Sequence, residues 1–369
     1  MGVFQEGQNI LGIYEVERFL GEGAFAEVYR VKHRFLGRQA MKIFKITGIT
    51  LDEVVEMLGE AFLLSKLRHP NIVSIFDANT TETAKGVCGF FTMEYVAGGT
   101  LDKYWKSFRN RIVPVESAVD ITRQICLGLS VAHSEDPPIV HRDIKPQNIL
   151  VGYDKEGLHV RISDFGLAKK ANPLTLMVSA RGTRCFKAPE TFDNFQSDSC
   201  GGDVWAIGSV LYLLITDRLP YLNVGETDVF DSECFLRPLT LPSKINWHVD
   251  RFLDNILLRA LAPKPAERYS NAMEMLVDLN KWKPGLDGKT AQDKSDIASS
   301  TEKSVLGALS SMDDKEVSGD MANRALLLAR NIRTLPEAAD LMEEAFNKLP
   351  KLREKYEHRV KLWRKGIMQ

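Results

Sequence analysis

Residues 141–148, which read HRDIKPQN, constrain this chain more than any other stretch. They bring together a carboxylate (Asp143), an ammonium group (Lys145) and a carboxamide (Asn148), and Asp164-Phe165-Gly166 begins sixteen residues after Asn148. A carboxylate can accept a proton from a hydroxyl, amide and carboxylate oxygens can hold a metal ion, and a lysine can neutralise a phosphate. Phosphoryl transfer needs little beyond such positioning and charge stabilisation, so these groups indicate that chemistry if a nucleotide is bound nearby.

The order His-Arg-Asp-x-Lys-x-x-Asn and then Asp-Phe-Gly resembles the signature of protein kinases, and the lysine resembles their serine/threonine branch. The resemblance implies ATP as phosphate donor, Asp143 as the base that takes the hydroxyl proton, and Lys145 as a contact to the γ-phosphate. It implies Asn148 and Asp164 as ligands of Mg²⁺, with Mn²⁺ as a substitute metal. We therefore expect the residues that hold ATP upstream of this stretch and a substrate platform downstream.

A glycine-rich turn lies between two strand-like segments near the start of the chain. Residues 21–28 read GEGAFAEV, and its glycines let the backbone fold closely over a phosphate and offer its N–H groups. A strand follows the glycines where a dinucleotide-binding turn would have a helix. Ala26 stands where the family has a third glycine, and we expect it to stiffen the loop tip. In the kinase family this turn covers ATP, which implies contacts from Gly21, Glu22, Gly23, Ala24, Phe25, Ala26 and Val28.

A lysine and a glutamate are expected to clamp the ATP phosphates together. Lys42 follows 19 residues after Gly23 in Ala-Met-Lys-Ile, which matches the family's strand lysine. Glu60 lies in residues 50–68, whose apolar spacing is that of an amphipathic helix, and the family pairs this glutamate with the lysine. A solvated surface glutamate is the ordinary alternative. Gly59 lowers helix propensity by about 1 kcal/mol relative to alanine, which suits a helix that swings in and out.

Residues 86–101, GVCGFFTMEYVAGGTL, indicate a buried strand and then a Gly-Gly break before a helix. In kinases this segment is the hinge, which implies that backbone groups of Glu94 and Val96 bond the adenine edge while Met93 limits the depth of the pocket. The apolar walls would come from Val28, Ala40 and Leu150. A plain core strand would explain the apolar residues but not the abrupt break.

Residues 182–190, GTRCFKAPE, resemble the kinase segment that seats a protein substrate, here Thr183, Ala188, Pro189 and Glu190. Thr183 is expected to contact the base, and Glu190 to form a buried pair with Arg268. Asp203-Val204-Trp205 matches the start of the helix that anchors the catalytic loop. Kinases of small molecules generally lack the Ala-Pro-Glu platform, so we expect protein substrates.

Control by phosphorylation follows from Arg142, which precedes the base. A cation at this position usually means that a phosphate on the following loop can be recognised. The resemblance therefore implies activation-loop autophosphorylation, with Thr175 and Ser179 as sites. Unmodified loop hydroxyls are an equal alternative at both positions.

Composition excludes several other classes of protein. The formal net charge is -1, so no global field favours nucleic acid or membrane. Five cysteines are scattered without metal-ligand spacing, which argues for a reducing compartment, and the N-terminus lacks the pattern of a secretory signal. The most apolar run, residues 204–216, is too short to span a bilayer and is expected to be a buried helix. We expect a cytoplasmic protein without a membrane span or a nucleic-acid partner.

The expected fold is α+β: a small antiparallel β-sheet lobe with one helix, a larger mainly helical lobe, and a C-terminal helical tail. The boundaries are an N-terminal extension (1–11), a kinase domain (12–285, dividing at about 95), a flexible linker (286–320) and the tail (321–369). The linker is rich in Ser, Thr, Asp and Lys, and helical periodicity returns after it. Its hydroxyls could be autophosphorylated, although a solvated spacer is the simpler interpretation.

The tail and the overall activity leave alternatives open. Residues 351–365 hold seven Lys or Arg against two Glu, which fits a solvated helix face, a helix packed on the kinase lobe to regulate it, a helix that docks a regulatory partner, or a nucleic-acid or membrane contact. For the whole chain the main rival is a catalytically silent pseudokinase or scaffold. Such proteins usually lose the lysine or one aspartate, and both aspartates and the lysine are present here. A second rival is a kinase domain that chiefly receives a signal delivered through the tail.

Overall fold

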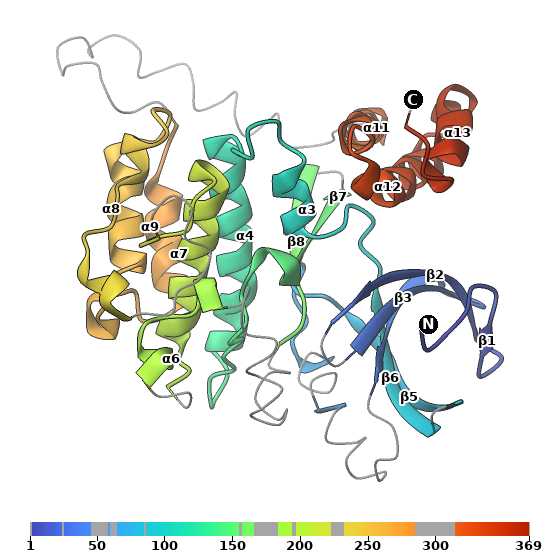
Figure 1. Ribbon diagram of the computed structural model, residues 1–369, viewed down its shortest axis with the longest axis horizontal. Coiled ribbons are helices and arrows are strands. Elements are labelled where there is room, and N and C mark those ends of the chain that lie inside the picture. Colours follow the sequence, from blue (N-terminus) through green and yellow to red (C-terminus); the bar gives the residue numbers. More distant parts are fainter. Residues whose placement is uncertain are drawn as a thin grey trace, which may run out of the picture.

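The structure is a computed structural model that describes residues 2–23, 26–45, 58–59, 65–84, 86–154, 157–165, 184–193, 197–222, 232–284 and 314–368. A sheet lobe, a helical lobe and a group of C-terminal helices are arranged as the sequence predicts (Figure 1). Most of the helix predicted over residues 50–68, including Glu60, lies outside the described residues.

Six strands form the antiparallel sheet of the first lobe, in the order β1-β2-β3-β4-β6-β5. Alternating side chains give each face of the sheet its own apolar cluster. One cluster includes Tyr14 and Val31, and the other includes Ala40, Phe91 and Met93. The second cluster also contacts Leu150 of the helical lobe, so this face looks into the space between the lobes. The strands are β1 (Asn9–Ile10), β2 (Tyr14–Glu22), β3 (Ala26–His33), β4 (Gly37–Phe44), β5 (Ile75–Thr83) and β6 (Gly86–Glu94).

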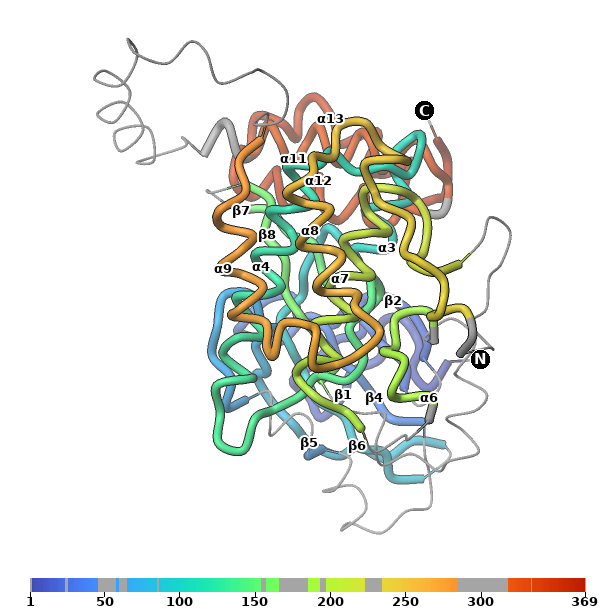
Figure 2. Tube along the Cα trace, turned by 90° about the vertical axis from the view of Figure 1, so that its left-hand side faces the viewer, coloured from blue at the N-terminus to red at the C-terminus, as the bar shows by residue number. Residues whose placement is uncertain are grey.

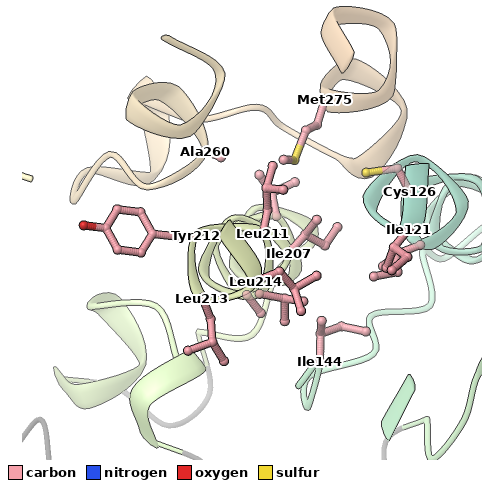
Figure 3. Close-up of a cluster of buried hydrophobic side chains, with 14 of the residues drawn as sticks. Ile121, Cys126, Ile144, Ile207, Leu211, Tyr212, Leu213, Leu214, Ala260 and Met275 are labelled. Carbon is pink, nitrogen blue, oxygen red and sulfur yellow. The ribbon is translucent and has the colours of Figure 1, made fainter. Parts of the chain in front are cut away.

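The helical lobe is built around α7 (Cys200–Thr216), in which every residue from Asp203 onward is buried. Figure 3 shows its Ile207, Leu211 and Leu214 surrounded by side chains of the neighbouring helices. The apolar run 204–216 is therefore the buried helix that the sequence predicts. No helix in the described part of the chain is long and apolar enough to cross a membrane.

Capping side chains fix where several of these helices begin. Ser199 accepts a hydrogen bond from the Gly202 N–H at the start of α7, and Asp250 and Asn271 cap the next two helices in the same way. The other helices and strands of this lobe are α3 (Leu101–Lys106), α4 (Val115–His133), β7 (Ile149–Asp154), β8 (Gly157–Ile162), α6 (Glu190–Asp193), α8 (Arg251–Ala260) and α9 (Ala272–Lys281). Its short 3₁₀ turns are η1 (Pro146–Asn148), η3 (Arg184–Phe186), η4 (Ser232–Leu236), η5 (Pro242–Lys244) and η6 (Pro265–Glu267).

Three helices form the tail, with a core of their own that includes Met321, Phe346 and Trp363. They gather at one end of the molecule, beside α3 and β7 (Figure 2). The helices are α11 (Asp314–Leu328), α12 (Leu335–Lys348) and α13 (Lys351–Arg364), and the turn η7 (Ile332–Thr334) leads into α12.

Residues 314–320, which the sequence analysis assigns to the linker 286–320, are helical and belong to α11. Its first two turns are polar and carry no apolar periodicity, so the sequence did not separate them from a linker. Pro336 lies in the first turn of α12, where the helical pattern of the sequence also allows it, and the chain breaks at Leu349-Pro350 between α12 and α13. Residues 285–313 lie outside the described part.

Candidate active site

Asp203 of α7 holds the loop that carries the predicted catalytic residues. Its carboxylate accepts hydrogen bonds from the backbone N–H groups of His141 (2.7 Å) and Arg142 (2.8 Å), and lies 3.0 Å from Nε2 of His133. Burial alone would raise the pKa of Asp203, but the hydrogen bond and charge of His133 hold that pKa below its usual value. The ionised carboxylate keeps Arg142 in a left-handed conformation with φ of 72°, which a non-glycine residue adopts only when its surroundings enforce it.

Asp143, Lys145 and Asn148 converge, as the sequence predicts. Lys145 Nζ lies 2.7 Å from Oδ2 of Asp143, and Asn148 Nδ2 donates to the same oxygen at 2.9 Å and to the Asp143 carbonyl at 2.8 Å. The Asp143 N–H donates to Nδ1 of His141 at 3.2 Å. The carboxylate is therefore fixed from several directions, and its side chain remains 20% exposed, which leaves it accessible to a hydroxyl group.

Lys42 of β4 reaches across to Asp164 and forms an ion pair with it. Burial alone would raise the pKa of Asp164, but the nearby Lys42 ammonium holds it below its usual value. Asp164 has a φ of 64°, while Phe165 beside it is buried against the His141 ring with 4.5 Å between ring centroids. Ser163 joins this segment to Asn148 through a backbone hydrogen bond of 2.9 Å. The two predicted metal ligands thus belong to neighbouring segments.

The predicted adenine pocket is a single apolar cluster. Val28, Ala40, Met93 and Leu150 all belong to it. Ala26 of the glycine-rich turn, also predicted to contact ATP, belongs to the same cluster. Sequence reasoning missed the remaining members, although the strand periodicity of β6 could have indicated Phe91. They are Leu20, Phe44, Leu58, Val73, Ile75, Phe91 and Tyr95.

A hydrogen bond and an ion pair hold Glu94, the last residue of β6, at the start of the hinge. The Glu94 N–H donates to the Ser74 carbonyl at 2.9 Å, and its carboxylate lies 2.7 Å from Nε of Arg161 on β8. Burial raises the pKa of Glu94. Gly98 follows because a Cβ there would lie 2.3 Å from the Val151 carbonyl oxygen. This close approach explains the first glycine of the pair, which a plain core strand would not need.

The glycine-rich turn is described at its two ends. Gly23 N–H donates to the Ala26 carbonyl at 2.8 Å, which closes the turn, and Glu22 pairs with Lys45 at 2.6 Å. Ala24 and Phe25 lie outside the described residues.

The predicted buried pair of the substrate platform is present. Both guanidinium NH groups of Arg268 donate to the Glu190 carboxylate at 2.7 Å, and the Arg268 side chain is fully buried. Ala188 is buried beside it, and Pro189 begins the turn into α6. Arg142 is predicted to recognise a loop phosphate, and its Nε lies 3.4 Å from Oδ2 of Asp198. Thr175, Ser179 and Thr183 lie outside the described residues, so their roles stay predictions.

Comparison with known families decides the class of protein. The protein kinase domain family matches residues 14–280. This chain belongs to the protein kinase family.

Curated relatives and solved structures agree with that assignment. The serine/threonine-protein kinase PrkC of Bacillus subtilis is 34% identical over 279 residues, 74% of this chain and 41% of PrkC. A probable serine/threonine-protein kinase of Clostridium acetobutylicum is 33% identical over 73% of this chain and 40% of its own length. This chain thus matches about 40% of the length of such relatives. The crystal structure of the Mycobacterium tuberculosis PknI kinase domain, 24% identical, superposes with a TM-score of 0.55 over 75% of this chain and 98% of that domain, which shows the two-lobed kinase fold.

One contact of the hinge with the tail was not predicted from the sequence. Tyr95 of the hinge donates its hydroxyl to Asp340 of α12, so a tail residue touches the segment between Glu94 and Val96. The tail sequence showed helical periodicity but carried no signal for this contact.

Proposed function

We propose that this protein transfers the γ-phosphate of ATP to serine and threonine hydroxyls of protein substrates. The observation that carries the proposal is the meeting of Lys145 and Asn148 on the carboxylate of Asp143, near the ion pair of Lys42 with Asp164. Asp143 would orient the substrate hydroxyl and accept its proton, and Lys145 would stabilise charge on the transferring phosphoryl group.

The nucleotide would lie between the sheet and the hinge. Its adenine would fit the cluster of Val28, Ala40, Met93 and Leu150 and bond to the backbone of Glu94 and Val96. Lys42, with Glu60 as its proposed partner, would hold the α- and β-phosphates under the turn of residues 21–26. The ion pair of Lys42 with Asp164 supports this position, because it places the ammonium group at the junction of the lobes.

The donor set suits Mg²⁺. Asn148 and Asp164 supply an amide oxygen and a carboxylate, the hard ligands that this ion takes alongside phosphate oxygens and water. The metal would neutralise charge on the phosphates, and Mn²⁺ would serve as a substitute.

The proposal also covers organisation, control and location. A catalytic domain would occupy residues 12–285, and autophosphorylation at Thr175 or Ser179 would control it through Arg142. Thr183, Ala188, Pro189 and Glu190 would seat a protein substrate, supported by the rigid pair of Glu190 with Arg268. All five cysteines are free, and four are buried, which supports a reducing cytoplasmic location.

The test is transfer from γ-labelled ATP with Mg²⁺ to a generic basic protein and to the chain itself. Asp143→Asn should lower the rate about a thousandfold in a protein that still unfolds cooperatively, because the base is lost. Glu135→Gln, an exposed carboxylate next to α4, is the matched control and should leave the rate unchanged. Mapping the labelled residues would show whether Thr175 or Ser179 is modified. ATP binding without any transfer by the wild-type protein would contradict the catalytic proposal and leave a scaffold.

A further inference from the structure

Asp340 of α12 is a buried carboxylate that joins the tail to the sheet lobe and the hinge. Only 1% of it is exposed, and it forms ion pairs with Arg18 of β2 and Arg30 of β3. Tyr95 of the hinge donates its hydroxyl to the same carboxylate, and Arg364 of α13 lies 2.5 Å from it. Figure 1 shows α12 above the sheet lobe and beside α3.

The negative charge of Asp340 compensates the repulsion between two arginines of the sheet. Arg18 and Arg30 face each other directly in the β2–β3 pairing, and like charges at such positions destabilise a sheet. Glu17 compensates part of the charge, 2.6 Å from Nε of Arg30. Burial alone would raise the pKa of Asp340, but the surrounding guanidinium groups hold it below its usual value, so the carboxylate is ionised at neutral pH.

Each partner of Asp340 in the kinase domain adjoins a part of the proposed nucleotide site. Arg18 lies two residues before Leu20 on the strand that runs into the glycine-rich turn. Arg30 lies two residues after Val28, on the same face of β3, because strand side chains alternate. Tyr95 separates Glu94 from Val96. The strand before the glycine-rich turn, the strand that carries Val28, and the hinge are therefore all held by Asp340.

Two further carboxylates of α12 contact the kinase domain, one on each lobe. Glu337, one turn before Asp340, forms an ion pair with Lys103 of α3. Glu343, one turn after Asp340, lies 3.0 Å from Arg38 at the start of β4. Residues three apart lie on one side of a helix, so this acidic face of α12 spans the two lobes behind the hinge.

A second tail helix strengthens the contact with the helical lobe. Arg324 of α11 donates to the Tyr104 carbonyl at 3.1 Å, and its guanidinium carbon lies 4.1 Å from the centroid of the Tyr104 ring. The tail thus has a fixed base on α3 from which α12 can hold the hinge and the sheet.

We propose that Asp340 is a positioning residue for the nucleotide site: through Tyr95, Arg18 and Arg30 it holds the hinge and the strands of the glycine-rich turn in the arrangement that binds ATP. The inference rests on the proposed use of ATP at this cleft. It assigns to the tail a task in substrate binding, and it requires no contact between the tail and the nucleotide.

The experiment is to measure ATP affinity and steady-state kinetics on the full-length chain with Asp340→Asn. Without the negative charge, Arg18 and Arg30 repel each other and Tyr95 keeps only a neutral amide oxygen as acceptor, so the site must be ordered when ATP binds. We expect the Kd and the KM for ATP to rise about tenfold while kcat changes by less than about threefold. Glu354→Gln, an exposed carboxylate of α13, is the matched control and should change neither constant.

A double-mutant cycle separates positioning from general destabilisation. Arg30→Gln should raise the Kd for ATP by itself, and adding Asp340→Asn to it should cost clearly less than in the wild-type background. If Asp340→Asn does not fold, Tyr95→Phe decides, since it removes only the hydroxyl and should raise the Kd about threefold.

The outcomes are distinct from failure of the proposed function. A folded Asp340→Asn protein with wild-type affinity for ATP, or unchanged affinity in Tyr95→Phe where Asp340→Asn does not fold, overturns the positioning role and leaves the kinase proposal standing. Failure of the wild-type protein to bind ATP overturns both.

Discussion

Two buried aspartates hold the two halves of the active site, and they do so in different ways. Asp203 is 2% exposed and Asp340 1%, and in both the pKa lies below its usual value despite burial. Asp203 holds the catalytic loop through the backbone N–H groups of two consecutive residues and one histidine ring. Asp340 holds the hinge and sheet through long side chains from β2, β3, α13 and the hinge.

The difference concerns how easily each anchor can be released. Backbone donors are fixed by the fold of the loop, so the Asp203 contacts persist as long as α7 and the loop are folded. Each guanidinium group around Asp340 must instead lose water and side-chain freedom, and the ion pairs must compensate that cost. The net free energy of the Asp340 contacts is therefore smaller, and these contacts are easier to break. A segment that docks on a folded domain requires contacts of this kind.

The largest effect is expected from Asp203→Asn. The new amide cannot accept from all three donors and places its own NH₂ group against an N–H, so we expect unfolding free energy to fall by about 3 kcal/mol. Because the catalytic loop loses its anchor, kcat should also fall at least about a hundredfold. Urea unfolding and steady-state kinetics measure the two effects.

Glu116→Gln, an exposed carboxylate in the first turn of α4, is the control and should be neutral in both assays. A stable Asp203→Asn protein with wild-type kcat would mean that the loop is held elsewhere, and the contrast with Asp340 would disappear.

Sequence reasoning found the Asp203 anchor and missed the Asp340 anchor for a physical reason. Asp203 and its donors lie in short segments whose order and spacing are characteristic of the family. Asp340 contacts Arg18 across 322 residues, Arg30 across 310 and Tyr95 across 245, and no local pattern records such pairs. Helix periodicity could indicate that α12 is packed but not against which surface.

The same reason explains the other successes and errors. The apolar cluster around Val28 and Met93 was predictable because strand alternation and the family motifs agree there. The helix at residues 314–320 was not, because this stretch is mostly polar. The pairing of Glu60 and the phosphorylation of Thr175 and Ser179 concern residues outside the described part of the chain and stay predictions.

Lowering the pH should weaken the contacts of Asp340 before those of Asp203. Asp340 has a lowered pKa in the folded protein, so its stabilising contribution is complete above the unfolded pKa of about 3.9 and is lost as pH falls through the folded value. The arginines stay charged and then repel each other, whereas two of the three donors of Asp203 are uncharged backbone N–H groups and the third is the His133 ring. We therefore expect α12 to lose about tenfold in hydrogen-exchange protection below about pH 4, before α7 does, after correction for intrinsic exchange rates.

Asp340→Asn provides the internal control, because α12 should then be weakly protected already at pH 7 and change little on acidification. Loss of protection in α7 before α12 would show that the tail is the more firmly held of the two regions.

The smallest effect is expected where α12 meets the helical lobe. The Lys103 side chain is 35% exposed, so its ion pair with the more buried Glu337 is open to solvent at the cationic end and should contribute about 0.5 kcal/mol to stability. Lys103→Met should therefore cost about that much in urea unfolding at low salt and almost nothing in 1 M NaCl, where the Debye length is about 3 Å. The penalty of Asp340→Asn should persist at both salt concentrations, since its partners are largely buried. Equal salt dependence of the two variants would mean that water reaches the Asp340 cluster. In that case the hinge would be held by an exposed, weak contact, and the tail could not fix the geometry of the nucleotide site.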